Sequence, residues 1–268
     1  DLPSLQAYLQ YVRGNTTELS ILQQSFLISV TAFFRDPETF QVLDKLLRQL
    51  LDSKQDGDSI RVWVPGCATG EEVYSIAMLL ADMGAEVVHI ESPARPDLIR
   101  LMPPYSNGQA ASHNYLNRNK QSVALDLKNP DSIALILSKI SSYDIVIEQF
   151  RPGVMQRLGL DYPRLAAINP RLIYCSVSGY GQTGSHKSRA GHDINYLALS
   201  GIAGHSGRQH SGPPPMGIQI ADVAGGSLHA LIGILSAVIE RSQSGLGQHI
   251  DISMTDCAAA LNSMAAAA

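Results

Sequence analysis

The sequence lacks the features that mark secreted and membrane-spanning proteins. Its three cysteines, Cys67, Cys175 and Cys257, are odd in number and have no metal-ligand spacing, so they predict neither a disulfide framework nor a metal site. No apolar run reaches the roughly 18 residues that a membrane span needs, and no basic segment leads into an apolar stretch near Asp1. We therefore expect a cytoplasmic protein without a signal peptide.

Positive charge is also scarce. The formal net charge is −4 and the isoelectric point is about 6.0, which argues against nucleic acid or an anionic membrane as the partner of the whole surface. A local basic pocket for a small anionic ligand remains allowed. With 268 residues, 45% of them hydrophobic, the chain is long enough for one large domain or two ordinary ones.

The first part of the chain has helical periodicity. Leu5, Tyr8, Leu9 and Val12 recur at helical spacing, and the same spacing returns after Asp36-Pro37. We expect residues 1–58 to form a helical segment that precedes a separate α/β domain over residues 59–268.

The α/β domain follows from an alternation of short apolar strands and helices. A strand over residues 60–64, a glycine turn over 66–70 and a helix over 71–82 open the pattern. Further strands are expected at 85–90, 122–127, 145–147, 172–177 and 248–252, with helices at 130–140 and 225–239. This order predicts a Rossmann-like, doubly wound and mostly parallel sheet. The stretch 178–215 is too long for a plain connector, so we expect it to carry function or mobility.

Two motifs near the N-terminus resemble the chemotaxis-receptor methyltransferases. They are Ile28–Pro37, which ends in Phe-Phe-Arg-Asp-Pro, and Val64–Ser75, which contains Gly66-Cys-Ala-Thr-Gly70. In that family the first helps to form the S-adenosylmethionine site, and the second lets the backbone approach the cofactor. The pattern stops after Asp82, so the resemblance implies a methyltransferase fragment.

From about residue 80 onward the chain resembles the family III CoA-transferases, and among them the α-methylacyl-CoA racemases. The motifs that carry the resemblance occur in the family's order: Asn117–Lys128, Phe150–Leu160, Gly179–Gly184, Gly191–Gly201 and Ala221–Gly226. The resemblance implies that the domain is truncated at its C-terminus, and that the complete family member is a homodimer. A natural fusion, a recombined fragment and a constructed chimera are equally compatible with the junction.

The resemblance implies an acyl-CoA-handling enzyme. His192 and Asp222 match the catalytic pair of the racemases, which remove the α-proton of a 2-methylacyl-CoA from one face and return a proton to the other. A histidine titrates near neutral pH and burial can raise the pKa of a carboxyl, so the two groups could exchange roles. Read alone, Asp222 would be a helix cap before Gly225-Gly226.

Asp193 is the rival catalytic centre. In the transferases of this family the corresponding acid is a nucleophile that first takes the acyl group and then carries CoA as a thioester. In the racemase interpretation Asp193 is structural. The histidine that precedes it favours the racemase, and CoA transfer remains the alternative.

Coenzyme A, as part of the substrate, is the cofactor that the resemblance implies. Arg151 and Arg157 are expected to contact it, with Arg118 and Lys120 near its phosphates, because guanidinium groups offer forked donors to phosphate oxygens. S-adenosylmethionine is a weaker alternative that rests on the N-terminal fragment, and a non-catalytic hybrid fold is a further one.

Overall fold

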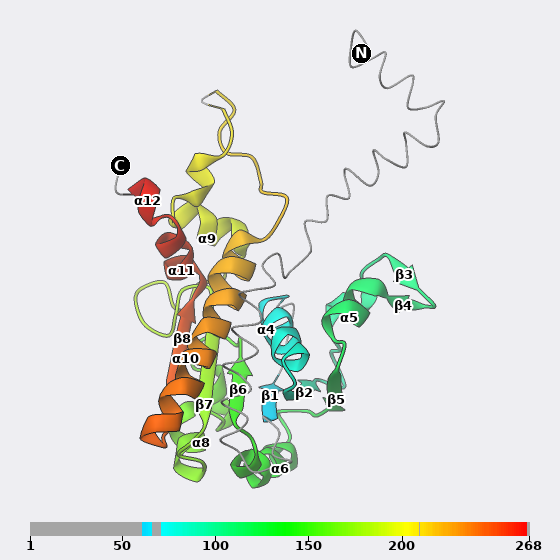
Figure 1. Ribbon diagram of the computed structural model, residues 1–268. Coiled ribbons are helices and arrows are strands. Elements are labelled where there is room, and N and C mark those ends of the chain that lie inside the picture. Colours follow the sequence, from blue (N-terminus) through cyan, green and yellow to red (C-terminus); the bar gives the residue numbers. More distant parts are fainter. Residues whose placement is uncertain (1–60, 66–70, 209, 267–268) are drawn as a thin grey trace. The chain divides into compact units, whose positions relative to one another are not determined.

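The protein is described here from a computed structural model, which defines residues 61–65, 71–208 and 210–266. The expected helical segment over residues 1–58 and the glycine turn over 66–70 lie outside the described residues. The described part is built around a parallel sheet whose strands lie in the order β5-β2-β1-β6-β7-β8 (Figure 1). This arrangement confirms the Rossmann-like α/β fold that the sequence predicts.

The strands occur where hydrophobic alternation predicts them, with one shift. They are β1 (Arg61–Pro65), β2 (Glu86–Glu91), β5 (Lys120–Ala124), β6 (Ile145–Glu148), β7 (Ile173–Ser178) and β8 (His249–Ser253). The expectation of a strand over 122–127 was wrong by about two residues. The strand begins at Lys120 because its register along β2 pairs Lys120 with Val87 and ends with Ala124 beside Glu91.

The order of the strands shows where a site can form. The chain runs outward from β1 through β2 to β5, then returns to the other side of β1 and continues through β6, β7 and β8. The direction of winding therefore reverses between β1 and β6. In open parallel sheets, ligands bind at the carboxyl ends of the strands beside such a reversal.

Helices cover both faces of the sheet, because neighbouring strand residues point to opposite sides. Val62 and Val64 belong to one core, which is closed by α4 (Glu71–Asp82) and α10 (His229–Ser244). Trp63 belongs to the other, which is closed by α6 (Pro130–Lys139), α7 (Val154–Leu158) and α8 (Tyr162–Ile168). Figure 1 shows α10 running along the sheet beside β7 and β8.

Shorter elements connect these layers. Between β2 and β5 lie η1 (Leu98–Leu101), the hairpin strands β3 (Tyr105–Ser106) and β4 (Gln109–Ala110), and α5 (Ala111–Leu116). The other short elements are η2 (Ile140–Ser142), α9 (Asp193–Leu199), η3 (Ile202–His205), η4 (Ala221–Leu228), α11 (Met254–Leu261) and α12 (Ser263–Ala266).

The helix expected over residues 225–239 is longer at both ends. It begins with the wide π-helical turns of η4 and continues as α10 to Ser244. The prediction ended at Ile239, but the helix continues past it, and the charged side chain of Arg241 is buried and pairs with Asp144, with Nη2 3.2 Å from Oδ1. By length and composition the stretch Ala221–Ser244 could cross a membrane. In the structure Ile234 is fully buried in the core against the sheet.

Candidate functional site

A cavity of about 810 Å³ lies at the carboxyl ends of β6 and β7. The segment that follows β6, Gln149–Pro152, and the end of β7, Val177–Tyr180, form part of its wall. Other parts of the wall come from the loop before α9, from the beginning of α9, from the segment Pro214–Gln219 and from Asp222. The cavity therefore occupies the place beside the winding reversal where the topology predicts a ligand.

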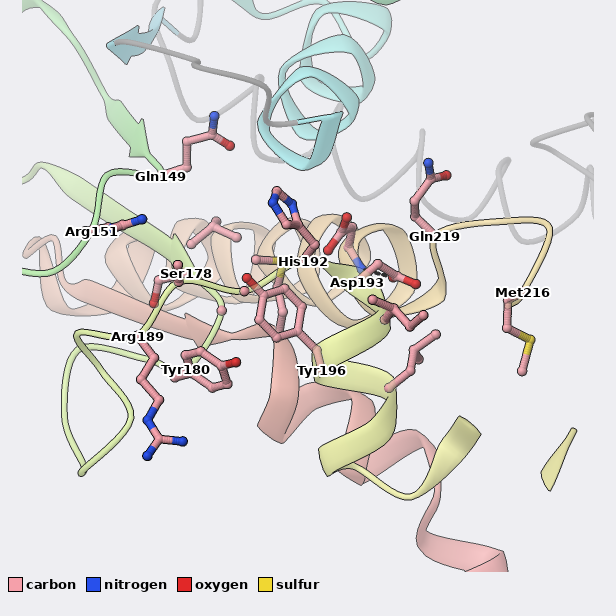
Figure 2. Close-up of a pocket in the computed structure, with 18 of the residues that line it drawn as sticks. Gln149, Arg151, Ser178, Tyr180, Arg189, His192, Asp193, Tyr196, Met216 and Gln219 are labelled. Atoms are coloured by element: carbon pink, nitrogen blue, oxygen red, sulfur yellow. Dashed lines mark hydrogen bonds between the residues drawn. The ribbon is translucent and has the colours of Figure 1, made fainter. Parts of the chain in front are cut away.

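His192 and Asp193 enter this cavity from the start of α9. The backbone N–H of His192 donates to Oδ1 of Asn195, with N and O 3.0 Å apart, which fixes the first turn of the helix. The His192 side chain is exposed and the Asp193 side chain is half-buried. Figure 2 shows both side chains beside the cavity, with the imidazole between Gln149 and Asp193 in this view.

Tyr196 holds the turn that carries His192. Its ring is buried, with 5% of the residue exposed, and it packs against Gly179 and Gly191. A Cβ at Gly179 would lie within 2.4 Å of the Tyr196 hydroxyl oxygen, and one at Gly191 within 2.6 Å of the ring. Tyr180 meets Tyr196 edge to face, with centroids 5.3 Å apart. Only glycine at these two positions lets the loop after β7 and the turn before α9 close on one aromatic ring.

Asp222 lies in the first turn of η4 and also lines the cavity. Its backbone N–H donates to Oδ1 of Asp193 over 3.0 Å. The expectation that Asp222 caps the helix was therefore wrong: Ile220 is the residue at the cap, and the carboxylate of Asp193 satisfies a free N–H of the first turn. Helix starts attract negative charge, so this position also suits Asp193 electrostatically.

The structure thus brings the three candidate catalytic residues, His192, Asp193 and Asp222, to one cavity. An imidazole and a carboxylate can act as two acid/base groups, and a second carboxylate is available as a nucleophile. No group of three or more His, Cys, Asp or Glu side chains that could hold a metal ion occurs among the residues that the structure describes.

Of the four residues expected to contact CoA, only Arg151 lines the cavity. Arg157 lies on α7 with an exposed side chain. Arg118 is turned toward α4, with Nη2 2.5 Å from Oδ2 of Asp82, and its guanidinium stacks 4.6 Å from the Tyr115 ring centroid. Lys120 donates weakly to Asn117, with Nζ and Oδ1 3.4 Å apart. Arg157, Arg118 and Lys120 do not line this cavity, and their contact with CoA stays a prediction.

Sequence reasoning missed several residues that line the cavity. They are Gln149, Tyr180, Lys187, Arg189, Met216 and Gln219. Four of them fall in or next to the stretch 178–215, whose length predicted either function or mobility. Gln149 directly follows a buried strand, and the rule that sites form at the carboxyl ends of parallel strands would have identified it.

A buried carboxyl supports the wall of the cavity from behind. Glu148 ends β6 with 3% of the residue exposed, and its Oε2 accepts the N–H of Phe150 at 2.8 Å. Burial raises the pKa of Glu148 to about 7, although hydrogen bonds from Ser176 and from the Phe150 N–H act in the opposite direction. Ser176 is itself 2.9 Å from Nε2 of His249. Glu148 thereby fixes the segment that carries Gln149 and Arg151.

The fold and the cavity define an α/β protein with a doubly wound parallel sheet and acid/base side chains at its carboxyl edge. The profile of CoA-transferase family III matches residues 73–268. The chain belongs to CoA-transferase family III, as its motifs indicate. A second profile, that of the SAM-binding domain of CheR methyltransferase, matches residues 29–92, which agrees with the resemblance of the N-terminal motifs.

Curated relatives carry two kinds of name. Acetyl-CoA:oxalate CoA-transferase from Acetobacter aceti is 42% identical over 180 residues, which cover 66% of this chain and 46% of the relative. Alpha-methylacyl-CoA racemase from Homo sapiens is 42% identical over 189 residues, which cover 70% of this chain and 45% of the relative. The chain thus spans about half the length of the curated relatives it matches.

A solved structure agrees with the fold. A CAIB/BAIF family protein from Brucella suis superposes with a TM-score of 0.72 at 35% identity, covering 78% of this chain and 56% of the other.

Proposed function

We propose that the protein is an acyl-CoA-handling enzyme that inverts the configuration at the α-carbon of a 2-methylacyl-CoA. The observation that supports this most directly is that His192 and Asp222 line one cavity from two different elements, α9 and η4. The hydrogen bond from the Asp222 N–H to Asp193 links these elements. The 42% identity to alpha-methylacyl-CoA racemase from Homo sapiens supports the same reaction.

The chemistry needs two opposed acid/base groups. A ring nitrogen of His192 takes the α-proton, and the electron pair of the broken C–H bond moves to the thioester oxygen to give an enolate. The protonated carboxyl of Asp222 then returns a proton to the opposite face of the same carbon, and the roles reverse for the other enantiomer. General acid/base catalysis of this kind contributes roughly 10²- to 10⁴-fold.

Coenzyme A would be held by cations at the rim of the cavity. Arg151 follows β6, while Lys187 and Arg189 belong to the loop after β7. Arginine offers paired donors to phosphate oxygens, and the three side chains supply positive charge on a chain whose net charge is −4.

Isotope exchange tests the proposal. A 2-methylacyl-CoA incubated with the protein in heavy water should gain deuterium at the α-carbon. H192Q and D222N should each lower the exchange rate by about 100-fold or more. H210Q changes an exposed histidine outside the cavity and is the matched control. An unchanged exchange rate in both active-site variants would refute the assignment.

CoA transfer through Asp193 is the second candidate, supported by the 42% identity to acetyl-CoA:oxalate CoA-transferase. Here the Asp193 carboxylate attacks the thioester carbonyl and displaces CoA thiolate, giving a mixed anhydride. The thiolate then attacks the aspartyl carbonyl, which releases the donor acid and leaves an aspartyl-CoA thioester. An acceptor carboxylate reverses these two steps. Hydroxylamine should trap the acyl-enzyme in this mechanism, whereas a racemase forms no such adduct.

Two other assignments remain open. The N-terminal motifs support S-adenosylmethionine binding, but Ile28–Pro37 and the glycine turn over 66–70 lie outside the described residues. Calorimetric titration tests that alternative. In a non-catalytic hybrid, coenzyme A would leave the melting temperature unchanged, because a ligand stabilises a protein only if it binds the native state. We further propose that the complete protein is a cytoplasmic homodimer without nucleic-acid or membrane partners.

A further inference from the structure

Asp222 lies at the start of a helix whose first turns are unusually wide. Over η4 (Ala221–Leu228) the backbone follows a π-helix, in which each hydrogen bond spans five residues instead of the four of an α-helix. The backbone tightens at His229, whose N–H donates to the Gly226 carbonyl three residues earlier, and α10 follows. Such wide turns are rare and are often found at functional sites, so their cause bears on the cavity.

Two side chains donate to carbonyl oxygens of the wide turns. Nδ1 of His229 lies 2.6 Å from the Ala224 carbonyl oxygen, and Oγ of Ser227 lies 3.4 Å from that of Asp222. Each bond reaches five residues back along the chain, which is the spacing of the π-helix itself. Because a carbonyl oxygen can only accept, Nδ1 of His229 carries the proton. The shorter bond therefore fixes the orientation of the ring and braces the turn.

Close backbone contact holds the same turns against α11. A Cβ at Gly225 would lie 2.9 Å from the Met254 carbonyl oxygen and 3.3 Å from the Ala258 nitrogen. Glycine thus lets η4 approach the backbone of α11. His229 is half-buried and does not line the cavity, so its hydrogen bond acts on the backbone of η4 and not on a ligand.

The direction in which the Asp222 carboxylate points depends on the wide turns. Each residue of an α-helix advances the chain by about 100° around the axis, so tightening η4 to α-helical turns would rotate Asp222 relative to α10 by an angle of that order. Such a rotation would carry the carboxylate away from the cavity that it lines. It would also break the hydrogen bond from the Asp222 N–H to Asp193.

We propose that His229 is a positioning residue, which holds the wide turns of η4 through the Ala224 carbonyl and thereby keeps the Asp222 carboxylate at the cavity. This rests on the proposed acid/base role of Asp222. Nδ1 carries a hydrogen both in this neutral tautomer and in the charged imidazole, so protonation of the ring leaves the bond in place.

Substitution of His229 tests this role. H229L removes the donor, whereas H229N keeps an amide N–H near the position of Nδ1. We expect H229L to lower kcat for α-deuterium exchange by about tenfold to 100-fold, with KM changed less than about twofold, and H229N to restore most of the loss. S242A is the matched control, because it removes a hydrogen bond to the Ile239 carbonyl near the other end of α10, away from the cavity.

A double-mutant cycle separates positioning from general damage to the fold. If His229 acts through Asp222, H229L should lower the residual exchange rate of D222N by less than about twofold, because the group that it places is already gone. Thermal melting of H229L beside S242A recognises a folding defect. A loss in the D222N background as large as in wild type would show that His229 only stabilises the fold, and would refute the inference.

One readout does not depend on catalysis. The carboxyl carbon of Asp222 is identified in NMR spectra of carbon-13-labelled protein by its absence from D222N. Its chemical shift should change in H229L and stay the same in H229N and S242A. An unchanged signal in H229L refutes the positioning role, whether or not the protein is active. If the signal shifts as expected but wild type exchanges no α-proton, His229 still positions Asp222 and racemisation fails.

Discussion

The backbone N–H of Asp222 donates a hydrogen bond to Oδ1 of Asp193, with N and O 3.0 Å apart. This bond ties the carboxylate of Asp193 to the backbone of Asp222, the rival catalytic residue, and joins the start of α9 to the start of η4. In α-proton transfer Asp193 would position Asp222. In CoA transfer it would be the nucleophile, so the same bond has different consequences for the two reactions.

Substitutions of Asp193 distinguish these roles. D193N keeps an oxygen that can accept the Asp222 N–H, whereas D193A removes the acceptor. If the protein is a racemase, D193N should retain deuterium exchange within about tenfold of wild type, and D193A should lose more, because an unpaired N–H costs about 1–3 kcal/mol. Exchange is measured by mass spectrometry of the acyl-CoA. Equal and near-complete loss of CoA transfer in both variants would instead indicate a nucleophilic Asp193.

The glycines around Tyr196 should not tolerate a methyl group. G191A would place its Cβ 2.6 Å from the Tyr196 ring, so we expect a loss of about 1–3 kcal/mol in the free energy of unfolding. Urea denaturation measures this loss. G204A is the control, because a Cβ at Gly204 would meet nothing within 4 Å. A stability of G191A equal to that of G204A would contradict the packing described here.

Glu148 should make stability depend on pH. Burial raises its pKa to about 7 from 4.5, so between these values the unfolded state binds fewer protons than the native state and stability falls as pH rises. E148Q keeps an acceptor for the Phe150 N–H and removes the titration. The difference in free energy of unfolding between E148Q and wild type should therefore favour E148Q by about 2.5 kcal/mol more at pH 8 than at pH 5.

Denaturation of the two proteins at both pH values measures this difference. E240Q, which changes an exposed carboxyl on α10, should show no such change with pH. A gain for E148Q that is the same at pH 5 and pH 8 would show that Glu148 titrates in the folded protein as it does in the unfolded chain.

Arg100 should hold the part of the cavity that η1 contributes. Its Nε lies 3.0 Å from Oε2 of Glu91, and its Nη2 lies 2.5 Å from Oε1. Burial opposes ionisation of Glu91, but hydrogen bonds from Arg100 and Ser122, together with the nearby positive charges, outweigh it and lower the pKa to about 2. This stabilisation is present above pH 4.5 and is lost as pH falls toward 2.

R100M should therefore lower stability at pH 7 by about 2 kcal/mol and move the acid unfolding midpoint upward. Because Ile99 and Met102, which lie on either side of Arg100 in the chain, line the cavity, KM should rise more than kcat falls. R95M, which changes an exposed arginine of the same connection, is the control. An acid transition at the same pH in R100M and R95M would contradict this account.

The sequence alone determined the sheet and the family. Alternating apolar segments located the strands, since each must bury one or both faces, and the motifs Phe150–Leu160 and Gly191–Gly201 identified the relatives. Local pattern also singled out the stretch 178–215 for function or mobility, because a long connector without structure of its own is uncommon in a compact domain. These inferences depend on neighbours in sequence, which is why they could be made without coordinates.

The tertiary structure decided which of the candidate residues meet. It brought Arg151 to the cavity and turned Arg118 toward Asp82, although both are arginines in family motifs. It also showed that Asp222 does not cap the helix. Its own backbone N–H donates to the carboxylate of Asp193, which lies twenty-nine positions earlier in the chain. The tertiary structure also placed Met216 on the side of His192 away from Arg151 and Arg189. Contacts between segments far apart in the chain depend on how helices pack on the sheet, and residue spacing does not specify that packing.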